Sequence, residues 1–151
     1  MGLGGDNVLY VATALAHPDD QDLLRRIQLH RERRNPHWGL LELAGGSLDP
    51  VFEAAGEHGA VLLDSLTLWV SARTYGEEES GTLEEFERFV ELAERIREPV
   101  ILVSDEVGLG VVPESEEGRR FRDLLGLVNQ RAAEAADEVH LCVAGIAHRI
   151  K

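Results

Sequence analysis

The sequence predicts a three-layer α/β protein, in which helices cover both faces of a mainly parallel β-sheet. Short, continuous apolar runs recur along the chain, and segments with helical periodicity separate them. Strands that are apolar along their whole length are typical of parallel sheets, which are buried on both faces. The chain has 151 residues, of which 44% are hydrophobic and 28% charged, so we expect one domain over residues 1–151.

The first half of the chain alternates strands and helices. The apolar runs predict strands at 7–12, 38–43 and 60–64. Helical spacing of Leu23, Leu24 and Ile27 predicts a helix that ends before Pro36, because proline disfavours helical geometry in the residue before it. A shorter helix is expected over 47–57.

The second half continues the alternation. Residues 65–76 are expected to be helical in part, and the pair Thr82 and Glu85 predicts a capping box that starts a helix running to about Arg97. The remaining pattern predicts a strand over 99–104, a glycine-bearing loop over 106–115 and a long helix over 116–136. A last buried strand over 138–144, in which Cys142 is a small hydrophobic residue, and an edge strand over 146–151 follow.

Charge and composition exclude several classes of protein. The formal net charge of −13 argues against a surface devoted to nucleic acid or anionic lipid. No apolar run approaches the roughly 20 residues that span a bilayer, and no signal peptide is recognisable, so we expect a cytoplasmic protein without a membrane span. Lys151 is the only lysine, so the sequence contains no phosphate-binding loop of the form G-x-x-x-x-G-K-[ST].

Polar residues at strand ends are the first candidates for a ligand site, because ligands bind beyond the carboxyl ends of parallel strands. Thr13, Asp64 and the run Ser104 to Glu106 occupy such positions. Four apolar residues leading to Asp64 resemble a Walker B strand, whose carboxylate binds Mg²⁺. The alternative is a carboxylate that marks where a strand returns to solvent.

The segment 25–37 holds five arginines and one glutamate in an acidic chain. Helical spacing places Arg26, His30 and Arg33 or Arg34 along one face. Guanidinium groups bind phosphate oxygens, and an imidazole among them can attack phosphorus. The alternative is an exposed basic face with an incidental histidine.

Five ordered blocks resemble one family. They are VLYVATA, RIQLHRERRNPHW, VLLDSLTLWVS, SDEVGLGVVPE and the segment from RRFRDLL to the C-terminus. They are similar to the adenosylcobinamide kinase and adenosylcobinamide-phosphate guanylyltransferase family of cobalamin biosynthesis. The resemblance implies a P-loop NTPase-like (RecA-like) domain assembled as a homotrimer. It implies phosphorylation of adenosylcobinamide, then guanylyl transfer from GTP through a guanylyl-histidine.

The resemblance also implies roles for particular residues. His30 matches the guanylylated histidine. Asp64 matches an acidic residue of the nucleotide site that binds the cofactor Mg²⁺. GTP or ATP would serve as the nucleotide substrate. The other positions that match nucleotide contacts are Ala12, Thr13, Ala14, Arg31, Glu32, Arg33, Arg34 and Glu42.

The sequence departs from the family pattern in two respects. The family normally begins with a strand and a P-loop, which this sequence lacks, and Asp105 stands where the family usually has asparagine. An added negative charge near phosphates is expected to weaken nucleotide binding. Three interpretations follow: a truncated form of an ordinary enzyme, a non-catalytic remnant that assembles with full-length partners, or a different module that binds phosphates with its arginines.

Overall fold

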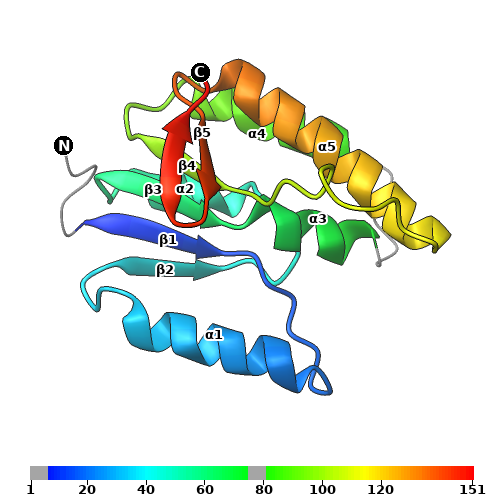
Figure 1. The fold of residues 1–151 in the computed structure, drawn as a ribbon. Helices are drawn as coiled ribbons and strands as arrows, with labels where there is room; N and C mark the ends of the chain where they lie inside the picture. Colours follow the sequence, from blue (N-terminus) through cyan, green and yellow to red (C-terminus); the bar gives the residue numbers. More distant parts are fainter. Residues whose placement is uncertain (1–6, 75–80) are drawn as a thin grey trace.

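The computed structural model describes residues 7–74 and 81–151. They form a β-sheet with helices packed on it, and a separate β-hairpin (Figure 1). In chain order the elements are β1 Val8–Ala12, α1 Gln21–Arg33, β2 Gly39–Glu42, α2 Pro50–Ala55, β3 Ala60–Asp64, α3 Leu66–Thr74, α4 Thr82–Ala93, β4 Val100–Val103, α5 Glu116–Ala135, β5 His140–Val143 and β6 Ile146–Arg149. None of the helices in the described part of the chain is long and apolar enough to cross a membrane.

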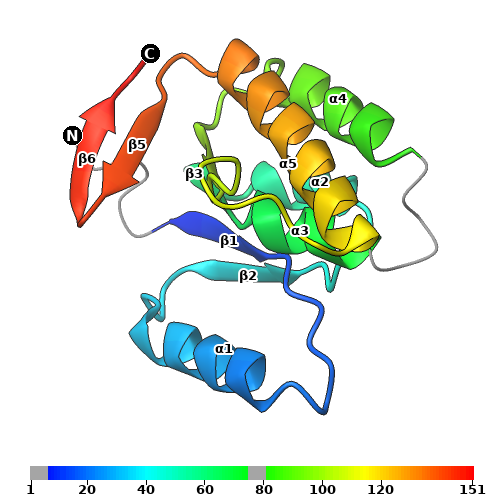
Figure 2. The same cartoon turned by 45° about the vertical axis from the view of Figure 1, so that its right-hand side comes forward.

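The main sheet has four parallel strands in the order β2-β1-β3-β4. Ala12 at the end of β1 lies in register with Glu42 on one side and with Asp64 on the other. Helices lie on both faces of the sheet, so the predicted three-layer α/β fold is confirmed (Figure 2). The register brings the carboxyl ends of three strands to one edge.

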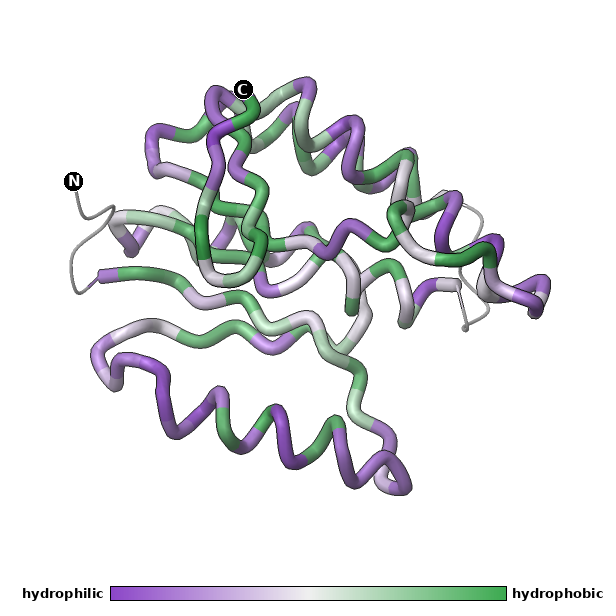
Figure 3. Tube along the Cα trace, in the orientation of Figure 1, coloured by the Kyte–Doolittle hydropathy of each residue, from purple (hydrophilic) through white to green (hydrophobic). Residues whose placement is uncertain are grey.

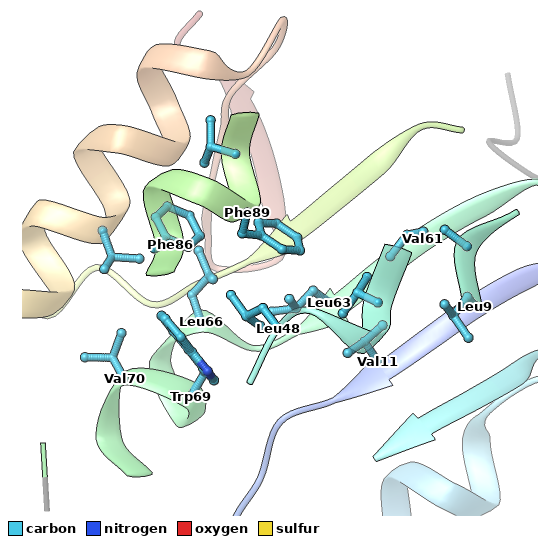
Figure 4. Packing of buried hydrophobic residues seen from close by; sticks show 14 of the residues in the cluster. Leu9, Val11, Leu48, Val61, Leu63, Leu66, Trp69, Val70, Phe86 and Phe89 are labelled. Atoms are coloured by element: carbon cyan, nitrogen blue, oxygen red, sulfur yellow. The ribbon is translucent and has the colours of Figure 1, made fainter. Parts of the chain in front are cut away.

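One face of the sheet carries the hydrophobic core. Leu9 and Val11 of β1 and Val61 and Leu63 of β3 are fully buried on this face, because successive strand residues point to opposite faces. Figure 4 shows them packed beside aromatic residues of the covering helices. The largest buried side chains from those helices are Trp69, Phe86 and Phe89.

In the described part of the chain, α1 is the helix that covers the opposite face of the sheet, and it lies apart from the other helices (Figures 1 and 2). Asp20 caps the helix by accepting a hydrogen bond from the Leu23 amide, and the chain leaves helical geometry at Arg34, as Pro36 predicts. No residue of α1 is buried, and its trace is largely hydrophilic (Figure 3). Polar contacts therefore contribute much of what holds α1 to the sheet.

The C-terminal strand prediction is wrong in its partner and its burial. The run that contains Cys142 forms β5, which pairs antiparallel with β6 and, within the described residues, not with the parallel sheet. Ala144 and Gly145 both have positive φ and turn the chain back within two residues, as in a type I′ hairpin. Cys142 is consequently exposed rather than buried.

The predicted capping box does not form. Gly81, in left-handed geometry, is the N-cap of α4, and Thr82 is the first helical residue and is buried. Glu85 instead accepts a hydrogen bond from the Leu48 amide and forms an ion pair with Arg73. The helix ends at Ala93, before the predicted Arg97. The end of the predicted partial helix over 65–76, and the acidic residues 77–79, lie outside the described residues.

The buried ion pair of Arg73 with Glu85 generates a stability prediction. Their side chains are 7% and 12% exposed. Glu85→Ala removes this buried carboxylate from Arg73 and from the Leu48 amide whose hydrogen bond it accepts, so we expect the free energy of unfolding in urea to fall by about 3–5 kcal/mol. Glu87→Ala on the same helix is the matched control, since Glu87 meets Arg131 at the surface, and it should cost less than about 1 kcal/mol. Equal losses for the two variants would contradict the prediction.

Candidate functional site

Three polar side chains lie on the face of the sheet that α1 covers. Tyr10, Glu42 and Asp64 share this face because β1 alternates with period two and is in register with β2 and β3. The adjacent residues, Val11 and Leu63, point into the core. The strand ends therefore present a phenol and two carboxylates toward α1.

The last turns of α1 supply the facing groups. His30 Nδ1 lies 3.9 Å from Asp64 Oδ2, and Arg31 donates a hydrogen bond of 2.7 Å to Glu42 Oε1. The His30 side chain is 70% exposed and the Asp64 side chain 25% exposed. The structure thus brings together the histidine and the carboxylate that the sequence singled out separately.

Tyr10 anchors Asp64. Its hydroxyl donates a hydrogen bond of 2.6 Å to Asp64 Oδ2, the same oxygen that faces His30. Burial, the hydrogen bond to Asp64 and the charge of Asp64 raise the Tyr10 pKa far above its usual value, against the smaller opposing effect of Arg34. The phenol therefore stays protonated and remains a donor to the carboxylate.

The Tyr10 ring also contacts the segment that connects α1 to β2. The guanidinium carbon of Arg34 lies 5.2 Å from the Tyr10 ring centroid, a cation–π contact. The Trp38 ring stacks on Tyr10, with centroids 6.5 Å apart and an interplanar angle of 24°. Sequence reasoning missed both aromatic residues, although period two in the strand would have placed Tyr10 on the same face as the polar strand ends.

The segment Ala12 to Ala14 lies at the edge where the strands end. Thr13 is fully buried, and its hydroxyl donates to the Ser65 carbonyl at 2.7 Å and accepts from the Ser65 amide at 2.9 Å. Its side chain therefore ties the ends of β1 and β3 together. Ala12 and Ala14 are partly exposed on either side of it. A ligand can reach this turn through those two residues and not through the Thr13 hydroxyl.

The other residues of the basic segment do not converge on Asp64. Glu32 accepts a hydrogen bond from Gln28, and Arg26 forms an ion pair with Asp22, within α1. Arg33 is exposed. Only part of the predicted arginine cluster thus lies against the sheet.

A second cluster of polar residues lies at the end of β4. Ser104 donates to Asn129 Oδ1 at 2.6 Å, and Asn129 in turn donates to the Asp105 carbonyl at 3.1 Å. The Asp105 amide donates to the Thr67 hydroxyl at 2.8 Å. Asp105 is exposed, and its backbone amide and carbonyl make these contacts. Sequence reasoning missed Asn129, since nothing in the spacing of α5 singles it out.

The carboxylate of Asp64 has the right chemistry for Mg²⁺, which in nucleotide sites binds one or two carboxylates together with phosphate and water oxygens. Within the described residues, no group of three or more His, Cys, Asp or Glu side chains could hold a metal ion by itself. Glu42 is engaged by Arg31. A metal at this edge would therefore depend on Asp64 and on oxygens of its ligand.

Comparison with known proteins gives this geometry its context. Residues 3–150 match the family model described as cobinamide kinase / cobinamide phosphate guanyltransferase. The chain belongs to this family. A bifunctional adenosylcobalamin biosynthesis protein CobU from Salmonella typhimurium is 36% identical over 158 residues, covering 95% of this chain and 86% of the relative. The CobU protein of Escherichia coli gives the same identity and coverage.

A third relative carries the name CobP. This bifunctional adenosylcobalamin biosynthesis protein from Pseudomonas aeruginosa is 38% identical over 145 residues, covering 95% of this chain and 82% of the relative. The resemblance drawn from the five sequence blocks is thereby confirmed. The family match thus falls on a three-layer α/β fold in which His30 of α1 faces Asp64 at the end of β3.

The contact between Tyr10 and Asp64 generates a titration prediction. The chain has two tyrosines, so in a Tyr75→Phe background the phenolate absorbance reports Tyr10 alone. Asp64→Asn removes the carboxylate charge and weakens the hydrogen bond, so it should lower the Tyr10 pKa, whereas Arg34→Met removes the opposing cation and should raise it.

The direction of the pH dependence follows from the same contact. The folded-state pKa of Tyr10 lies above its unfolded value of about 10. The stabilisation from the neutral phenol is therefore complete below about pH 10 and is lost as the pH rises through the folded-state pKa. Alkaline unfolding followed by circular dichroism measures this loss. Identical phenolate titrations for the Asp64→Asn variant and its parent would contradict the assigned contact.

Proposed function

We propose that this chain transfers a guanylyl group from GTP to adenosylcobinamide phosphate through a covalent guanylyl-histidine at His30. The observation that carries the proposal is the position of His30. Its imidazole is mostly exposed, and its Nδ1 faces the carboxylate of Asp64 at 3.9 Å. A carboxylate on one ring nitrogen favours the tautomer that leaves the other nitrogen free to act as a nucleophile.

The first step forms a phosphoramidate. The lone pair of His30 Nε2 attacks the α-phosphorus of GTP, a P–N bond forms, the bond from the α-phosphorus to the bridging oxygen breaks, and pyrophosphate leaves. The ring then carries a positive charge with its Nδ1–H toward Asp64, whose negative charge stabilises it. In the second step an oxygen of the acceptor's phosphate attacks the same phosphorus, the P–N bond breaks, and neutral imidazole is regenerated.

The arginines of α1 have separate roles in this proposal. Arg31, held by Glu42, and the exposed Arg33 would neutralise the charge that develops on the phosphates. Arg34 lies against Tyr10 and holds the end of the helix. Mg²⁺, when bound at Asp64, would supply further neutralisation of the triphosphate charge. Ala12 to Ala14, Glu32 and Glu42 remain predicted nucleotide contacts.

The relatives are named as bifunctional proteins, so the proposal includes a second activity. This activity is phosphorylation of the adenosylcobinamide hydroxyl by GTP or ATP, which generates the phosphate that the guanylyl transfer consumes. A homotrimeric assembly is part of the same proposal. The competing candidate is nucleotide binding by the exposed arginines without turnover, and the observation that favours it is that His30 Nδ1 lies beyond hydrogen-bond distance of Asp64.

Labelling with GTP tests the proposed histidine. Incubation with Mg²⁺ and GTP labelled at the α-phosphorus should leave an acid-labile, alkali-stable label on the chain, because a phosphoramidate hydrolyses in acid. His30→Ala should abolish it, whereas His37→Ala should retain it. His37 is an exposed histidine of the same basic segment, so it controls for nonspecific labelling. A label that survives His30→Ala would remove His30 from its role.

Calorimetry separates the competing candidate from the enzyme. If the unmodified chain takes up no label but GTP still releases heat that falls on Arg33→Ala, the chain binds nucleotide without guanylyl transfer. The absence of heat at millimolar GTP would exclude both candidates. Retention of binding heat in His30→Ala together with loss of the label would support the covalent role of this residue.

A further inference from the structure

Tyr10 connects the sheet to the histidine through two routes. Its hydroxyl donates to Asp64 Oδ2 at 2.6 Å, and this oxygen is the one that lies 3.9 Å from His30 Nδ1. Its ring contacts the Arg34 guanidinium and the Trp38 ring. Both routes lead to the proposed nucleophile.

The second route reaches His30 through the backbone. Arg34 is the C-cap residue of α1, and its amide donates a hydrogen bond of 3.0 Å to the His30 carbonyl. A contact that holds Arg34 on the Tyr10 ring therefore restrains the turn of helix on which His30 lies. Since α1 has no buried residue, such polar and aromatic contacts decide how this turn is placed on the sheet.

We propose that Tyr10 is the positioning residue of the guanylyl-transfer site. Its hydroxyl holds Oδ2 of Asp64 toward His30, so that the imidazole proton resides on Nδ1 and the lone pair of Nε2 is presented to phosphorus. This inference rests on the proposed function of His30 and adds a positioning residue to it.

The chemistry requires such a residue. A neutral imidazole has one proton, and the hydrogen bond made by one ring nitrogen determines which nitrogen remains basic. A carboxylate performs this task only if its own orientation is fixed, and outer partners commonly provide that restraint. Asp64 is partly exposed and can rotate, and the Tyr10 hydroxyl holds one of its oxygens.

The separation of 3.9 Å between Nδ1 and Oδ2 is longer than a hydrogen bond. Catalytic hydrogen bonds are often long in the free enzyme and shorten when the substrate binds. A small rotation of the exposed imidazole shortens this contact, provided that Oδ2 stays in place. The hydroxyl of Tyr10 supplies that fixed position.

Nitrogen-15 NMR of the protein without nucleotide tests the proposal independently of activity. The chemical shifts of Nδ1 and Nε2 report which nitrogen carries the proton, and the His30 signals are those missing from His30→Gln. We expect Tyr10→Phe to lower the ratio of the Nδ1–H to the Nε2–H tautomer about threefold, the change expected for one hydrogen bond. Asp64→Asn should lower it by at least as much.

Trp38→Phe is the matched control, because it alters the stacked ring and keeps the hydroxyl of Tyr10. Its tautomer ratio should equal that of the unmodified chain. An unchanged ratio in Tyr10→Phe would overturn the proposal. An equal fall in Tyr10→Phe and Trp38→Phe would also overturn it, because a displaced helix would then explain the loss. Far-ultraviolet circular dichroism checks that each variant is folded, and Tyr10→Met, which also lacks the hydroxyl, takes the place of Tyr10→Phe if that variant does not fold.

A double-mutant cycle extends the test to the reaction. Because the reactive tautomer becomes about threefold less populated when one hydrogen bond is lost, Tyr10→Phe should slow labelling by GTP by at least about threefold. In an Asp64→Asn background the same substitution should change the rate less than about twofold, because Tyr10 acts through Asp64. A full additional loss would overturn the proposal. A chain that takes up no label fails the proposed function, while the tautomer measurement still decides the role of Tyr10.

Discussion

The register between β1 and its two neighbours is the constraint on which the candidate site depends. Because Ala12 lies opposite both Glu42 and Asp64, the two carboxylates flank the end of β1 and point to the same face as Tyr10. A shift of one residue would reverse every side chain on a strand, burying the carboxylates in the core and exposing its valines and leucines. The same register that builds the core therefore aligns the polar groups.

The two faces of the sheet differ in how they are stabilised. One is closed by aromatic and aliphatic side chains such as Trp69 and Phe86, and burial of each contributes on the order of 2 kcal/mol. The other is closed by α1 through contacts such as Arg31 with Glu42, which are half exposed, and exposed ion pairs contribute at most about 1 kcal/mol. The proposed nucleophile thus lies on the less firmly held helix, where a nucleotide has access to it.

Sequence patterns predicted the site in part, for reasons visible in particular residues. Asp64 follows a strand that is apolar throughout and His30 lies among arginines, so both stood out from local composition. Their approach to within 3.9 Å depends on how α1 is placed over the parallel strands, which local composition does not predict. Cys142 was assigned to the core because its surroundings are apolar, yet β5 pairs with β6 and leaves it exposed.

By itself the sequence determined the alternation of strands and helices, the family, and the residue types at the strand ends, since these depend on local periodicity and on short ordered motifs. Only the tertiary structure decided which strands pair, which carboxylate meets the histidine, and that Glu85 neutralises Arg73 instead of capping its own helix. The physical reason is that a hydrogen bond or an ion pair goes to whichever partner the packed chain brings within reach. Tyr10 and Asp64, 54 positions apart, become partners only when β1 and β3 lie side by side.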